Sequence, residues 1–100
     1  MYNTPENWSL TTYTNNTWTT VLTGAAIVAS VIIANTDAGS PITVAMRVGT
    51  TVIVPFTEIA AGTTYTIDVR SLAIKAGQAL GFQASAAGVH VIASGAIEGA

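Results

Sequence analysis

Charge is the scarcest property of this sequence. Only 8% of its 100 residues are Asp, Glu, Lys or Arg, against roughly 25% in an ordinary soluble domain. A free monomer usually keeps itself in solution with a surface of mixed charge. The surface must therefore consist mainly of Thr, Ser, Asn and Ala, or other subunits must cover much of it. We favour the second interpretation, because apolar surface with little charge is typical of permanent assembly interfaces.

Other absences argue against whole classes of site. Cysteine is missing, which excludes disulfides and thiolate metal sites. The three Lys and Arg residues form no basic stripe that could neutralise phosphates, so we expect no nucleic-acid partner. The first seven residues lack the basic and apolar regions of a signal peptide. The longest near-apolar run, Ala25–Ala34, is too short to cross a bilayer as a helix, so we expect no membrane partner.

The titratable side chains do not suggest a catalytic site. A nucleophilic triad needs a histidine beside Ser or Cys and a carboxylate, and the single histidine, His90, is expected on a strand surface. Asp37 is explained by a turn. Asp68 is explained by a pair with Arg70 or, across strands, with Arg47. The sequence therefore predicts no enzyme, no cofactor and no metal site.

The chain from Thr17 onward alternates short β-forming segments with turn residues, as β-sandwiches do. Apolar and polar side chains alternate with a period of two in Ile42–Val48 and in Thr63–Arg70, which indicates half-buried strands. Gly49-Thr50 predicts a tight hairpin turn. The remaining segments are expected strands at Thr17–Thr23, Ala25–Asn35, Thr51–Val54, Gln78–Ser85 and Val89–Ile97, and a loop or a short helical turn at Ser71–Ala76.

Proline and glutamate mark the end of one expected strand. Pro55 cannot donate a hydrogen bond to a neighbouring strand, so the strand that begins at Thr51 ends there or lies at a sheet edge. Glu58 is then expected in the loop before Ile59.

Seven or eight short strands without an amphipathic helix predict an all-β fold, an antiparallel β-sandwich that is jelly-roll-like or Ig-like. The sandwich would occupy residues 17–100. Residues 1–16 are rich in Asn and Thr and show no clean period, so they are expected to form an extended N-terminal arm. Two interpretations stay open: a flexible terminus, or an arm that docks on a neighbouring subunit. The expected interface side chains of the arm and first strand are Tyr2, Trp8, Tyr13 and Trp18.

Three stretches carry a likeness to known proteins: ANTDAGSPITVAMRV (Ala34–Val48), AGTTYTIDVRSLAIKAGQALGFQASAAGVHVIASG (Ala61–Gly95) and the trailing Ala96-Ile97-Glu98. They resemble a group of small tailed-phage virion proteins, in which a strand ending in Asn-Thr leads through a small-residue turn to a second strand and a later segment closes a β-sandwich. The resemblance covers roughly two-thirds of the chain and leaves residues 1–16 outside.

The resemblance implies a virion structural protein without catalytic residues. Such proteins are typically head decoration (cement) subunits, often homotrimers, that bind the outside of the shell and bridge major capsid proteins. The protein would be made in the host cytoplasm and lie on the exterior of the phage particle. A role in a tail, neck or head-fibre appendage is a second hypothesis. A third is a carbohydrate- or host-surface-binding module that stacks sugar rings on Trp8, Tyr13 or Trp18.

Overall fold

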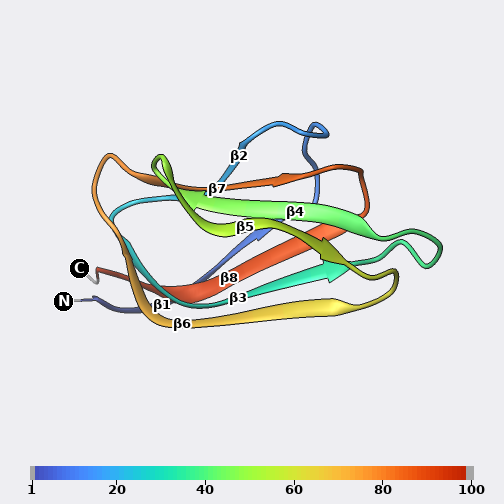
Figure 1. The fold of residues 1–100 in the computed structure, drawn as a ribbon. Helices are drawn as coiled ribbons and strands as arrows, with labels where there is room; N and C mark the ends of the chain where they lie inside the picture. Colours follow the sequence, from blue (N-terminus) through green and yellow to red (C-terminus); the bar gives the residue numbers. More distant parts are fainter. Residues whose placement is uncertain (1, 99–100) are drawn as a thin grey trace.

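A computed structural model describes residues 2–98 of the chain as two four-stranded antiparallel sheets packed face to face (Figure 1). This confirms the predicted antiparallel β-sandwich. Within these residues no helix is long and apolar enough to cross a membrane. The strands are β1 (Tyr2–Leu10), β2 (Thr19–Thr23), β3 (Ala26–Asn35), β4 (Ile42–Val48), β5 (Thr51–Ile59), β6 (Thr64–Ile74), β7 (Ala79–Ala84) and β8 (Val89–Glu98).

The order of the strands distinguishes between the two predicted kinds of sandwich. One sheet, the β1 sheet, has the order β1-β8-β3-β6, and the other, the β4 sheet, has the order β2-β7-β4-β5. The first strand therefore pairs with the last, the second with the seventh, the third with the sixth, and the fourth with the fifth. Such nested pairing is a long hairpin rolled into two layers, which is the jelly roll.

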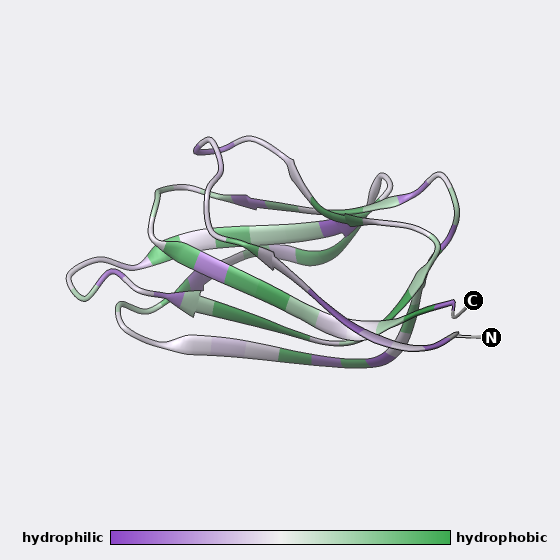
Figure 2. Cartoon of the chain, turned by 180° about the vertical axis from the view of Figure 1, so that it is seen from behind, coloured by the Kyte–Doolittle hydropathy of each residue, from purple (hydrophilic) through white to green (hydrophobic). Residues whose placement is uncertain are grey.

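The core lies between the sheets and is made by the inward side chains of every second residue. Hydrophobic colours accordingly run along the central strands, whereas β1 and the turns are mostly hydrophilic (Figure 2). Burying each large apolar side chain contributes roughly 1.5–3 kcal/mol, so this layer supplies most of the driving force for folding. The buried side chains include Leu22, Val28, Val31, Ile33, Ile42, Val44, Met46, Val54, Ile59, Ile74, Leu80, Phe82, Val89 and Val91.

The alternation predicted for β4 is confirmed. Ile42, Val44 and Met46 are fully buried in the core, and the intervening side chains point to the other face of the sheet. The strand then turns at Gly49-Thr50, as expected, and Val48 pairs directly with Thr51. Gly49 has a φ of 59°, a conformation that residues with a Cβ rarely adopt.

β5 is longer than the sequence indicated, and Pro55 does not end it. The strand lies at the edge of the β4 sheet, where a missing N–H faces solvent and not a partner strand. The register skips at this point, because Val44 pairs with Thr57 and Met46 with Val54, so that two β5 residues oppose Ala45. This β-bulge lets the strand pass the proline. Glu58 consequently lies in the strand and not in a loop.

β6 also extends further than expected. Ser71–Ile74 belongs to the strand, and its residues pair with Ala26, Ile27 and Val28 of β3. The segment is therefore neither a loop nor a helical turn. Its alternation was hidden because a register shift interrupts the β3–β6 pairing, and Arg70 takes a positive φ of 60° beside it.

The predicted division at residue 17 is where the structure differs most from the sequence analysis. The sandwich begins at Tyr2, because β1 pairs with β8 along its whole length and forms an edge of the β1 sheet. Residues 11–18 then connect β1 to β2. The segment did not look like a strand because an edge strand contacts the core with few side chains. Among the β1 side chains that the structure describes, only Trp8 and Leu10 pack against the core.

Candidate functional site

The structure does not bring the four expected interface aromatics together. The side chain of Tyr2 lies outside the part of the structure that is described, although its backbone pairs with that of Glu98. Trp8 is half-buried and packs against the core from β1. Tyr13 and Trp18, which flank the turn between β1 and β2, lie at two further places.

Tyr13 is fully engaged inside its own chain. Its hydroxyl donates a hydrogen bond to the carbonyl oxygen of Ala86 at 2.8 Å and accepts one from the N–H of Val89 at 3.0 Å. Its ring meets Phe82 edge to face, with 5.6 Å between the centroids. Burial raises the pKa of the Tyr13 phenol, and the hydrogen bond from Val89 opposes this rise in part. Tyr13 therefore fastens the β1–β2 connection to the β7–β8 turn.

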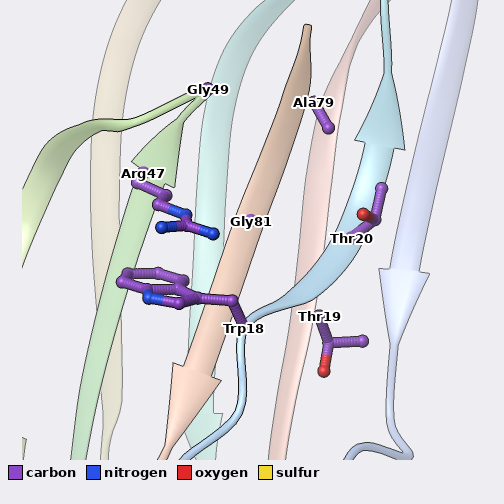
Figure 3. A pocket seen from close by; sticks show the side chains of 7 residues that line it. All are labelled: Trp18, Thr19, Thr20, Arg47, Gly49, Ala79 and Gly81. Carbon is purple, nitrogen blue, oxygen red and sulfur yellow. The ribbon is translucent and has the colours of Figure 1, made fainter.

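Trp18 forms a small hollow on the outer face of the β4 sheet together with Arg47 (Figure 3). The guanidinium carbon of Arg47 lies 4.3 Å from the centre of the indole ring, a cation–π contact. Beneath both side chains lies Gly81 of β7, where an added Cβ would be 3.5 Å from Arg47 and 3.6 Å from Trp18, at ordinary van der Waals distance. The sequence analysis did not pair these two residues, because they lie far apart in the chain, Trp18 directly before β2 and Arg47 in β4.

The hollow is small, and its polar side chains are Thr19, Thr20 and Arg47. Its volume is about 90 Å³, whereas pockets for drug-sized ligands hold roughly 300–1,000 Å³. The stacked guanidinium covers one face of the Trp18 ring, so that face is closed to a sugar. Within residues 2–98, Arg47 pairs with no carboxylate. Its N–H donors therefore remain open to an acceptor from outside the chain.

A larger surface continues from Arg47 along the outside of β4 and β5, and we call it the β4–β5 face. Direct pairing places Arg47 beside Val52 at one end and Thr43 beside Glu58 at the other. Phe56 lies between them, opposite Ala45. The two apolar side chains of β5 are strongly exposed, 67% for Phe56 and 52% for Val52. The β4–β5 face consists of Thr43, Arg47, Val52, Phe56 and Glu58, and Ala45 on the same side of β4 is fully buried beneath it.

The outer face of the β1 sheet carries a second exposed apolar pair. Ile32 of β3 and Ile92 of β8 are direct neighbours, and their side chains are 39% and 36% exposed. A polar row crosses all four strands next to them, and in it the hydroxyl of Ser94 donates to Asn7 Oδ1 at 2.8 Å. This polar row consists of Asn7, Ser94, Ser30 and Asp68.

The candidate acidic and histidine residues mostly serve the backbone or solvent. Asp37 accepts a hydrogen bond from the Gly39 N–H at 2.8 Å, which confirms its turn role. Asp68 accepts from the backbone N–H of Arg70 at 3.2 Å, so it meets the backbone and not the guanidinium. The alternative pair of Asp68 with Arg47 is wrong, because β6 and β4 belong to different sheets. His90 is exposed on β8, as expected.

No group of three or more His, Asp or Glu side chains that could hold a metal ion occurs among the residues described. Asn35 is an important residue that the sequence analysis did not single out. It is buried at the end of β3 and bonds to four backbone groups. The available signal was its position directly after an apolar strand and before the turn at Asp37.

Comparison with protein families, with curated proteins and with solved structures finds no match to this chain.

Proposed function

We propose that this chain is a structural subunit of a tailed-phage particle, a head decoration (cement) protein that stabilises the shell by bridging its capsid subunits. The observation that carries the proposal is the character of its two outer sheet faces. Each presents exposed large apolar side chains, Val52 and Phe56 on one face and Ile32 and Ile92 on the other. The sequence has only eight charged residues, so charge does little to prevent such surfaces from associating.

The fold supports this use of the surface. Paired exposed apolar patches rimmed by polar residues typically mark interaction sites. A jelly roll holds both faces rigidly, since every strand is paired and the core is closed, so little ordering is needed on docking. Subunits repeated over a symmetric shell bind through many modest contacts that act together. The resemblance of Ala34–Val48 and Ala61–Gly95 to small virion proteins points in the same direction.

The decisive experiment measures the amount and place of this protein in purified phage particles. Quantitative mass spectrometry should find a copy number comparable to that of the major capsid protein, and antibody labelling should mark the head exterior. Particles stripped of the protein should lose their genome at a lower temperature, and adding the purified chain back should restore heat resistance. A few copies confined to tail, neck or fibres would replace cement with the appendage role. Complete absence from particles would reject both.

A further inference from the structure

The β4–β5 face has opposite charges at its two ends and apolar side chains between them. Arg47 stands at one end and Glu58 at the other, beside Thr43. Thr43 and Arg47 are four residues apart on a regular strand, which corresponds to about 14 Å at 3.4 Å per residue. Phe56, the most exposed large apolar side chain described, lies midway. When a second copy of this face is turned end for end, its positive end meets the negative end of the first copy, and its negative end meets the positive end.

We propose that the β4–β5 face is a contact between two copies of this chain, related by a two-fold axis that lies across the strands at the level of Ala45 and Phe56. Such an axis reverses the strand direction between the copies. It places Arg47 of one copy over the row that contains Glu58 of the other, and the same pair forms a second time by symmetry. Two sheets stacked in this way lie about 10 Å apart.

The centre of the contact is suited to an apolar anchor. The axis brings the two Phe56 rings together, and each ring is 67% exposed in the single chain. Its neighbour across the strands, Ala45, is fully buried, so Phe56 itself forms the outer surface at this level. Energetically dominant interface residues are typically aromatic, central and surrounded by contacts that exclude water. Val52 lies on the same face beside Arg47 and extends the apolar surface around Phe56.

The charged ends are prepared for pairing. Stacking on Trp18 holds the guanidinium of Arg47 in place, 4.3 Å from the ring centre, and leaves its N–H fork without a carboxylate partner in the described chain. A planar fork held in this way suits two-pronged bonding to a carboxylate. Glu58 is exposed and forms no ion pair within residues 2–98. Complementary charges at both ends would fix the register of the two copies.

The arrangement uses the face of the sheet because the edge is blocked. β5 is the edge strand, but Pro55 removes a donor there and the bulge at Ala45 bends the strand, both of which discourage edge-to-edge pairing.

The two-fold contact does not depend on the virion role and would remain if that role failed. The test is sedimentation equilibrium of the full chain, in which the wild type should show twice the 10.2 kDa chain mass. Arg47→Glu and Glu58→Arg each place like charges opposite one another twice, so each variant alone should dissociate at least about tenfold more readily. An equimolar mixture of the two variants should recover the dimer, since both mixed pairs are then opposite in charge.

Phe56→Ser gives a test that does not involve charge. This side chain is largely exposed, so the variant should keep the circular dichroism spectrum and the melting temperature of the wild type while dissociating. Ile32→Ser on the outer face of the β1 sheet is the matched control and should leave the mass unchanged. A monomeric wild type would overturn the proposal. So would a trimer that Phe56→Ser leaves intact, or two single variants that fail to associate when mixed.

Discussion

At the scale of single residues, Asn35 shows how one polar side chain can hold together the end of a sandwich. Its side-chain nitrogen donates to the carbonyl oxygens of Ser40 at 3.0 Å and Ile59 at 3.1 Å, and more weakly to that of Ala60 at 3.4 Å. Its oxygen accepts from the N–H of Asp37 at 3.0 Å. Asp37, Ser40 and Ala60 lie in the β3–β4 and β5–β6 connections, two of those that cross between the sheets, so Asn35 provides partners that strand pairing does not.

Asn35→Ala should therefore lower the free energy of unfolding by about 2–3 kcal/mol, because it leaves several buried backbone groups without partners. Urea denaturation followed by circular dichroism measures this change. Asn7→Ala is the control, since Asn7 is exposed and its one side-chain partner is Ser94. That variant should change stability by less than about 0.5 kcal/mol. Equal effects of the two substitutions would refute the role given to Asn35.

Tyr13 makes a prediction about pH. Its pKa is raised above the ordinary value by burial, so the folded state holds the phenolic proton more tightly than the unfolded state does. The stability gained from Tyr13 is therefore fully present below about pH 10, where the unfolded phenol begins to titrate, and is lost as the pH rises further.

Tyr13→Phe removes the two hydrogen bonds to Ala86 and Val89 and should cost about 1–2 kcal/mol at neutral pH. The difference in unfolding free energy between wild type and variant should then shrink at pH values above about 10. Denaturation of both proteins across this range measures the gap. A gap that stays constant or widens with pH would contradict the assigned cause of the pKa shift.

At the scale of strands, the pairing of β1 with β8 makes β1 part of the sandwich and not an appendage. Deletion of residues 1–10 would leave the outer edge of β8 unpaired and uncover core that Trp8 and Leu10 now contact. We expect the shortened chain to lose several degrees of melting temperature and to aggregate, because an exposed edge strand recruits other chains. Thermal melting and light scattering test this. A shortened chain with unchanged stability would show that β1 is dispensable.

The strands that the sequence predicts well are those with one clear face. β4 alternates without interruption and was placed at its observed bounds, and the turn after it needs Gly49. β5 was predicted too short because Pro55 was expected to end it, and β6 because the register shift near Ser30 interrupts the period of two. β1 escaped notice because pairing with β8, not its own composition, makes it a strand. Long-range pairing of this kind leaves little trace in the local sequence.

The candidate surfaces were predictable only in part. The shortage of charge directed attention to contact surfaces, which stays a prediction, and four aromatic residues were expected at an interface. The structure instead uses Tyr13 inside the fold and stacks Trp18 on Arg47. That contact depends on the juxtaposition of β2, β7 and β4 in one sheet, and no spacing along the chain reports it. The exposed position of Phe56 could not be predicted from the sequence either, because it depends on the bulge in β5.

At the scale of the whole molecule, the nested pairing of the strands governs how the chain must fold. Only β4 and β5 form a local hairpin, whereas β1 must find β8 at the other end of the sequence. Bringing distant segments together has an entropy cost before contacts form, so folds of this kind are slow. We expect refolding in milliseconds to seconds after dilution from urea, followed by tryptophan fluorescence. Refolding within microseconds would contradict this expectation.

The pairing of Tyr2 with Glu98 also makes the polypeptide nearly a closed ring in space. A short engineered linker could join these ends, and the ring could be reopened at the opposite pole, in the exposed turn at Ala38, Gly39 and Ser40 (Figure 1). Such a circular permutant would keep all eight strand partners while moving its free ends across the molecule. The jelly roll thus offers two poles for attaching cargo, while the broad faces of both sheets stay clear.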